Sequence, residues 1–354
     1  MKNLLYILPP ALLAVQSFDS LLGGYFSYIR AAILLMLVFL FYVNFKFEID
    51  GVGRVILLFL AYTLIISFRS NNYEVTIPGY LSTLVSMSFY IVAYNSVKSF
   101  DDFIKFKSFF FWIPIIFIVT LILYTGFGFG EAVYDSYEGI RTGEGLHHNT
   151  IYTGVLVIVL SFVLLQYSSK KSRDLFLVAI MTIIIFLSLR RTAMILTIFS
   201  YISYLLMANK KQALKYVMPA IILMIIAYPI YEKPLNSAIE ARSSRLSFEH
   251  KYENEARFLE VKTITERVLR FDNIDYSLFG MEYLNSFGTY STWEFPVLPT
   301  RILHTDYAVV LHGAGIIGII SYASIILLLL LKSLQYARRF GFDDPISIFM
   351  FCSL

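Results

Sequence analysis

The stretch HTDYAVVLHGAGIIGIISYASIILLLLL, residues 304–331, decides the class of this protein. Its start carries His304, Asp306 and His312, and an apolar run without charge then continues to Lys332. A helix needs about 20 mostly apolar residues to cross a bilayer, and this segment is long enough. Ionisable groups are costly inside a bilayer and are tolerated mainly where they serve a function. We therefore predict a membrane-spanning helix with functional polar groups at one end.

The whole chain shares this apolar character. Of its 354 residues, 58% are hydrophobic and only 15% are charged, and the mean hydropathy is +0.68. Soluble domains are usually about 45–50% apolar and about 25% charged. The single cysteine, Cys352, excludes an internal disulfide framework and a cysteine-based metal site. The composition predicts an all-α, polytopic transmembrane helical bundle.

Apolar segments of sufficient length recur along the chain, and we expect about 10 or 11 spans. They lie at 3–22, 28–45, 53–69, 76–97, 107–126, 149–167, 174–189, 191–208, 214–231 and 304–331. The first resembles a signal peptide but has no small-residue cleavage site, so we interpret it as a retained span. Spans 174–189 and 191–208 are kept separate because one span cannot cover about 40 residues. An eleventh segment begins near 346 and reaches Leu354 after about nine residues, which we interpret as a span that continues in a longer protein.

Lysine and arginine in the short connections indicate the orientation. With the N-terminus in the cytoplasm, the inner connections carry a clear excess of positive charge, as the positive-inside rule requires. The short outer connections contain only Arg30, Arg69, Arg141, Arg190 and Arg191. We therefore divide the chain into nine spans within 1–231, an extracytoplasmic loop at 232–303, and a region at 304–354 with the tenth span and the start of another.

The long outer loop has helical periodicity in LSFEHKYENEARFLEVKTITERVLRF, residues 246–271. Its apolar positions predict one or two amphipathic helices on the outer face: Leu246, Phe258, Val261, Ile264, Val268 and Phe271. A turn-rich patch with Gly280 and Gly288 follows. The aromatic residues in that patch either stack on sugar faces or form an interfacial belt: Tyr283, Tyr290 and Trp293.

This topology gathers ionisable residues on the outer face: His147, His148, Arg190, Arg191, Arg257, Arg301, His304 and Asp306. Guanidinium groups bind phosphate bidentately and stay charged when partly desolvated. An imidazole that titrates near neutrality can take a proton from an attacking hydroxyl. Several arginines and a histidine without an obvious metal cage are typical of a site for a lipid-linked phosphate substrate.

Each of these residues also has a structural interpretation, which the sequence leaves open. Arg190 and Arg191 are suited to anchoring a helix end by snorkelling. His304 and the 147–149 segment fit helix caps, and Asp306 favours the positive end of a helix dipole. Arg257 fits a solvated helix face. Gly313, Gly315 and Gly318 indicate close packing between helices rather than catalysis.

Four segments between 145 and 332 also carry a family resemblance. They are GLHHNTIYTGVLVIVL, FLSLRRTAMI, NEARFLEVKTITERVLRFDNIDYSLFGMEYLNS and LHTDYAVVLHGAGIIGII. In this order they resemble the elements of the O-antigen polymerase and O-antigen ligase superfamily: a Gly-x-x-x-Asn segment, a Ser-Arg-Thr/Ser-Gly/Ala element, an outer-loop arginine helix with a glycine turn, and a His-Asn-x-Tyr/Phe-Leu stretch. Arg190 stands where the family has serine, Thr305 where it has asparagine, and Gly313 where an acid is common.

The resemblance implies a metal-independent, integral-membrane glycosyltransferase of the GT-C type in the bacterial inner membrane, with an extracytoplasmic active site and no cofactor. It implies catalytic roles for Arg191, Arg257 and His304. Arg191 and Arg257 would bind the diphosphate and His304 would act as base. The substrate-binding residues that it implies are Asn149, Arg190, Arg301, Asp306 and Tyr307. The implied partners are an undecaprenyl-diphosphate-linked oligosaccharide donor and acceptor, membrane lipid, a chain-length regulator and a flippase, with no nucleic acid.

Three activities fit these features. A polymerase joins lipid-linked repeat units into O-antigen, capsule or exopolysaccharide, and we favour it because polymerases vary freely to suit many repeat units. A ligase transfers the glycan to lipid A core. A transporter or flippase for the same lipid-linked sugar is the third; paired halves with interrupted helices, typical of transporters, are not evident in the sequence.

Overall fold

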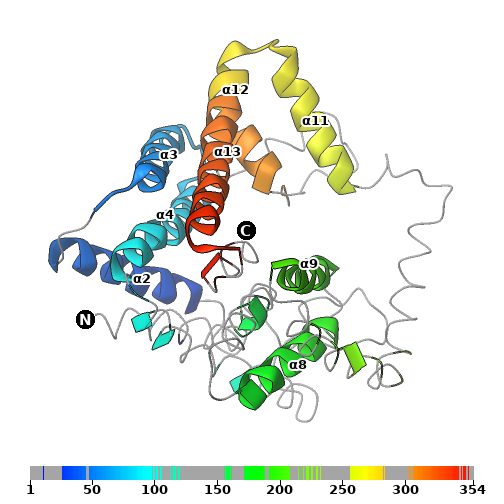
Figure 1. The fold of residues 1–354 in the computed structure, drawn as a ribbon. Helices are drawn as coiled ribbons and strands as arrows, with labels where there is room; N and C mark the ends of the chain where they lie inside the picture. Colours follow the sequence, from blue (N-terminus) through cyan, green and yellow to red (C-terminus); the bar gives the residue numbers. More distant parts are fainter. Residues whose placement is uncertain are drawn as a thin grey trace. The chain divides into compact units, whose positions relative to one another are not determined.

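A computed structural model describes residues 26–44, 48–97, 171–187, 191–207, 256–281 and 306–342, together with isolated residues such as Tyr283 and Leu303 (Figure 1). Within these ranges every regular element is an α-helix, which confirms the all-α prediction. The helices are α2 (Phe26–Asn44), α3 (Gly51–Ser67), α4 (Tyr73–Ser96), α8 (Lys171–Leu187), α9 (Arg191–Met207), α11 (Ala256–Arg270), α12 (Ile274–Phe279) and α13 (Asp306–Phe340).

The chain divides into two compact units. The first unit contains Met1–Arg30, Val97–Ser244 and Leu330–Leu354, and the second contains Ala31–Ser96 and Arg245–Leu329. Helices α8 and α9 therefore belong to the first unit. Helices α3, α4, α11 and α12, with most of α13, belong to the second unit.

Helices α3, α4 and α13 share one core of the second unit. Ile56, Phe59 and Leu60 on α3 are buried in it, with Val310 and Ile325 on α13. These α3 positions recur at helical spacing, which puts their side chains on one face of the helix. Partly buried residues of α4 pack against the same cluster: Tyr80, Leu84, Met87 and Tyr90.

Polar contacts fix the start of α3 against α4. The Asp50 side chain caps α3 by accepting a hydrogen bond from the Gly53 amide at 2.8 Å, and it also accepts one from the Tyr90 hydroxyl at 2.8 Å. An aspartate at this position satisfies one of the amides that a helix start leaves without a partner. Asn95, near the end of α4, bonds to the backbone of Glu48 in both directions, at 2.8 and 3.0 Å. The residues just before α3 and those at the end of α4 therefore lie together at one end of this helix pair.

The first unit contains the helix pair α8 and α9. Their contact includes a buried hydrogen bond of 2.7 Å between the hydroxyls of Thr182 and Tyr201. Helix α8 ends at Leu187 and α9 begins at Arg191, so the prediction of two separate helices at this point is confirmed. The buried carboxylate of Asp174, in the first turn of α8, lies 3.4 Å from the guanidinium of Arg173.

Two helices in the described ranges are long and apolar enough to cross a membrane: Tyr73–Ser96 and Tyr307–Phe340. Shorter apolar helices lie at Ala32–Val43, Gly51–Ser67 and Ala193–Leu206. The predicted helices 28–45, 53–69, 76–97, 174–189 and 191–208 agree with α2, α3, α4, α8 and α9 within a few residues. The predicted spans 3–22, 107–126, 149–167 and 214–231 and the segment from 346 lie wholly or largely outside the described residues, as does most of the turn-rich patch.

Helix α13 differs from the predicted span in two ways. It continues beyond residue 331 to Phe340, and its last turn carries Arg338 and Arg339. Lysine, glutamine and arginine are good helix formers, and cations are favourable at a helix C-terminus, so the helix does not stop where the apolar run stops. The helix is also interrupted at Gly315, whose φ of 64° and ψ of −164° are not helical.

Candidate functional site

The predicted amphipathic helix of the outer loop is α11. Ile264 and Val268 are fully buried and Val261 is partly buried, so three of the predicted apolar positions form its packed face. Phe271 does not continue this face, because the helix ends at Arg270. The Phe271 backbone has a left-handed φ of 56°, and its side chain is 44% exposed. A left-handed residue directly after a helix redirects the chain, and here it leads into α12.

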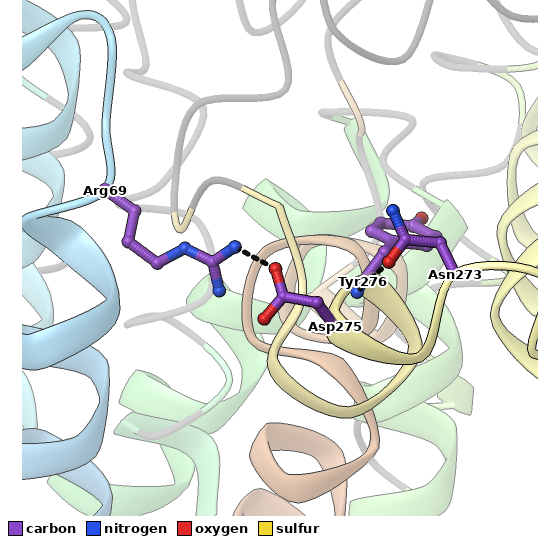
Figure 2. A network of polar contacts seen from close by, with 4 residues as sticks. All are labelled: Arg69, Asn273, Asp275 and Tyr276. Atoms are coloured by element: carbon purple, nitrogen blue, oxygen red, sulfur yellow. Dashed lines mark hydrogen bonds and ion pairs between the residues drawn. The ribbon is translucent and has the colours of Figure 1, made fainter.

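Helix α12 is a single short turn with defined ends. The Asn273 side chain caps it by accepting a hydrogen bond from the Tyr276 amide at 3.1 Å, and Gly280 ends it with φ of 75°. Figure 2 shows this cap beside an ion pair between Asp275 of α12 and Arg69, which follows α3. The two side chains are 39% and 62% exposed, so the pair is expected to add only about 0–1 kcal/mol of stability. The ion pair instead shows that two segments far apart in sequence lie side by side.

The loop helices pack on the start of α13. Ile264 and Val268 of α11 are buried together with Ala308 and Leu311 of α13, and Leu303 belongs to the same cluster. At the edge of this contact the hydroxyls of Thr265 and Tyr307 lie 3.3 Å apart. The arginine helix and the segment that carries the predicted histidine motif are therefore neighbours in the second unit.

Two glycines allow the α12 turn to meet α13 backbone to backbone. A Cβ on Gly280 would lie 2.4 Å from the Ala314 nitrogen, and one on Gly315 would lie 2.4 Å from the Leu278 carbonyl. The prediction that Gly315 is a close-packing position is confirmed. The sequence does not reveal its partner, because Gly280 lies in a separate loop.

The interruption at Gly315 is accompanied by hydrogen bonds from outside the helix. The Met281 amide donates to the His312 carbonyl at 2.9 Å, and the Tyr62 hydroxyl donates to the Ala314 carbonyl at 2.7 Å. Backbone polar groups without a partner are especially costly in an apolar environment. Side-chain and loop donors thus satisfy carbonyls beside the break, which is how α13 accommodates it.

His312 has a structural role. Its side chain is 1% exposed, and its Nδ1 lies 3.1 Å from the hydroxyl of Tyr276, with the two rings edge to face. Burial raises the pKa of Tyr276, an effect that the Arg267 guanidinium opposes, so the phenol keeps its proton at neutral pH. The contact between Tyr276 and His312 connects α12 to α13. Sequence reasoning did not single out Tyr276, although the preceding Asn273 is a recognisable helix cap.

This pair gives a first testable prediction. Changing Tyr276 to phenylalanine removes a buried partner of the His312 ring, and we expect a loss of stability of about 1–3 kcal/mol. The measurement is thermal or denaturant unfolding of the detergent-solubilised chain. Tyr307→Phe is the matched control, because the Tyr307 side chain is 41% exposed. Equal stability of the two variants would contradict the buried hydrogen bond.

The predicted site residues are distributed over both units. Arg191 is the first residue of α9 in the first unit, whereas Arg257, Asp306 and Tyr307 belong to α11 and α13 in the second. The structure thus brings the backbone of the arginine helix to the start of α13. The remaining predicted site residues lie outside the described residues, and so do the neighbouring histidines: Asn149, Arg190, Arg301 and His304, with His147 and His148.

Among the aromatic residues of the loop, Tyr283 differs from both interpretations offered by the sequence. It is only 2% exposed and packs edge to face on Phe59 of α3, with ring centroids 6.4 Å apart. It is therefore a core residue, and neither stacks on a sugar nor faces a membrane interface. Tyr290 and Trp293 lie outside the described residues.

In the part of the chain that the structure describes, no group of three histidine, cysteine or acidic residues is arranged to hold a metal ion. Comparison with known protein families, curated proteins and solved structures gives no match. The function is therefore inferred from the residues themselves and from the contacts of the second unit.

Proposed function

We propose that this chain is a multi-pass glycosyltransferase of the bacterial inner membrane. It would polymerise undecaprenyl-diphosphate-linked oligosaccharide repeat units on the extracytoplasmic side. The observation that carries the proposal is the packing of α11 on the start of α13. This contact supports a common site for the helix that contains Arg257 and for the segment that contains His304, since Leu303 is buried against α11 residues.

The surfaces of the helices support a membrane location. Beyond the two helices of spanning length, large apolar side chains point outward from shorter ones: Phe39 is 65% exposed, Leu58 70% and Leu206 76%. Soluble monomers rarely expose large contiguous apolar patches, whereas a lipid-facing helix requires them. We propose a bundle of about 10 or 11 spans, formed by the apolar segments that the sequence predicts.

Contacts between distant segments support the proposed succession of spans. Arg69 and the α12 residue Asp275 form an ion pair, and both belong to connections expected outside. Glu48 and Asn95 bond to each other, and both lie at helix ends expected inside. A topology that put either pair on opposite sides of the membrane would be incompatible with these contacts.

The proposed reaction is an inverting glycosyl transfer. The oxygen of an acceptor sugar hydroxyl forms a bond to the anomeric carbon of the donor glycan as the bond from that carbon to the diphosphate breaks. The diphosphate leaves with the electron pair, and Arg191 and Arg257 stabilise its charge with help from Arg190 or Arg301. The hydroxyl proton passes to His304 as general base. Asn149, Asp306 and Tyr307 would contact the substrate.

The acceptor distinguishes the polymerase from the ligase. A polymerase uses a second lipid-linked repeat unit, and a ligase uses lipid A core. Membrane lipid, a chain-length regulator and a flippase are the partners that the polymerase would require.

A transporter of the same lipid-linked sugar is the second candidate, and one observation favours it. Interrupted membrane helices are typical of transporter binding sites, and α13 is interrupted at Gly315. Cells that lack the protein distinguish the two candidates. Accumulation of single lipid-linked units on the outer side indicates a missing transferase, and accumulation on the inner side indicates a missing flippase.

The experiment that tests the proposed function uses purified protein, synthetic undecaprenyl-diphosphate repeat units and EDTA. We expect a ladder of products that increase by one repeat unit. Transfer only after lipid A core is added would indicate a ligase. Absence of transfer with both acceptors would contradict the glycosyltransferase proposal and favour the transporter.

A further inference from the structure

A polar hollow lies between the end of α11 and the start of α12. Its lining includes Asn273 and Tyr276, the two residues of the helix cap drawn in Figure 2. It encloses about 180 Å³, far more than the roughly 10–15 Å³ that one water molecule needs. Thr263 and Tyr276 are buried and form its base. Its rim consists of exposed polar residues: Glu266, Arg267, Arg270, Asp272 and Asn273.

The base of the hollow is fixed, which favours a preformed site. The Tyr276 ring is held by the His312 contact below, and the Tyr276 amide is held by the Asn273 side chain. Ile264 and Val268 are buried behind the same turn of α11. A ligand would therefore meet a base that needs little ordering, which lowers that part of the entropic cost of binding.

Several polar groups around the hollow retain capacity for a ligand. Within the described ranges, the Thr263 hydroxyl, the Asp272 carboxylate and the Asn273 amide nitrogen make no hydrogen bond to the chain. Arg270 and Glu266 are 3.6 Å apart, longer than an ordinary hydrogen bond, and both are about half exposed. Donors and acceptors are thus presented together in one small space.

The charges of the rim determine the class of ligand. Two guanidinium groups are balanced by two carboxylates, so an anion would meet Glu266 and Asp272 and a cation would meet Arg267 and Arg270. A neutral polyhydroxylated ring avoids both repulsions, because each hydroxyl can donate to a carboxylate and accept from a guanidinium or amide. Planar polar groups around a rigid base suit such a ligand.

We propose that this hollow is a binding subsite for a neutral sugar residue of the glycan. This inference rests on the proposed function for its ligand. It adds a recognition site that is separate from the residues assigned to the diphosphate and to proton transfer. Carboxylates and guanidinium groups that each hold sugar hydroxyls would fix the register of the glycan and select the repeat unit.

The test measures binding directly in the full-length chain in lipid nanodiscs. The probe is the repeat-unit oligosaccharide released by mild acid from the lipid-linked intermediates of the host, and inorganic pyrophosphate is the anion probe. Asp272→Asn and Arg270→Gln each remove one charge from the rim. Glu74→Gln and Arg54→Gln are matched controls, because each removes the same charge from an exposed helix position elsewhere in the second unit.

We expect each rim variant to weaken oligosaccharide binding about tenfold or more, because hydrogen bonds to charged groups are the stronger ones. The controls should bind as the unchanged protein does, and pyrophosphate binding should be the same in all of them. No oligosaccharide binding by the unchanged protein, or equal binding by the rim variants, would overturn the subsite. Loss of pyrophosphate binding in the rim variants would overturn it as well, by indicating an anion site.

The polymerisation assay on the same proteins separates the two proposals. If the unchanged protein forms no polymer but binds the oligosaccharide through Asp272 and Arg270, the subsite stands and the glycosyltransferase does not. If polymer forms and the rim variants keep the KM for the lipid-linked unit, the glycosyltransferase stands and the subsite does not. A raised KM with unchanged kcat would support both.

Discussion

Replacing Gly280 or Gly315 with alanine is expected to destabilise the second unit by about 3 kcal/mol or more. Both residues have positive φ, 75° and 64°, which costs a non-glycine residue energy even where space is available. Here there is no space either, because the added carbon would lie 2.4 Å from backbone atoms of the opposite segment. Backbone cannot rotate away as a flexible side chain can, so overpacking adds to the strain.

The measurement is thermal and denaturant unfolding of the full chain in detergent. Gly51→Ala is the matched control, since a Cβ on Gly51, in the first turn of α3, would have nothing within 4 Å. Alanine is a better helix former than glycine, so that variant should be as stable as the unchanged protein or slightly more so. If Gly315→Ala behaved like Gly51→Ala, the interruption of α13 and its contact with the α12 turn would be contradicted.

Changing His304 or Arg191 to alanine is expected to lower the initial rate of polymer formation about 100- to 1,000-fold in each case. Loss of a general base and loss of a donor to the leaving group typically have effects of this size. Arg191→Lys should retain only part of the rate, because lysine keeps the charge but cannot bind an oxygen pair bidentately. The assay is the product ladder measured with EDTA present.

Two matched controls accompany these variants. His250→Ala removes a histidine outside the segments that carry the family resemblance, and Arg54→Ala removes an arginine in the first turn of α3. Both should form polymer at the normal rate. Full activity of His304→Ala and Arg191→Ala together would contradict the assignment of the site, even if the protein proved to be a polymerase.

Much of the helical architecture could be predicted because the length of an apolar segment and the charges beside it are visible in a local stretch of sequence. Helices α2, α3, α4, α8 and α9 follow directly from their apolar runs. The periodicity of Val261, Ile264 and Val268 identified α11, because one apolar face must be buried whatever the partner. These signals need no knowledge of tertiary contacts.

The other features depend on partners that sequence spacing does not contain. The break at Gly315 requires the glycine of a separate turn, and the burial of Tyr283 requires the Phe59 ring. Phe271 matches the helical pattern yet lies beyond the helix, because a periodic apolar residue does not reveal where a helix ends. For the candidate site, the sequence predicted only the types of residue and their order along the chain. The packing of α11 on α13 is a tertiary contact, which spacing along the chain does not reveal.

The hydrogen bond from Tyr62 to the Ala314 carbonyl constrains when the second unit can fold during synthesis. The two residues are separated by 252 positions. At roughly 5–20 residues per second, a ribosome needs on the order of ten to fifty seconds to make the intervening chain. During that interval α3 is already synthesised while its partner helix does not yet exist. The second unit can therefore close only after residue 314 has been synthesised, with the intervening helices already made.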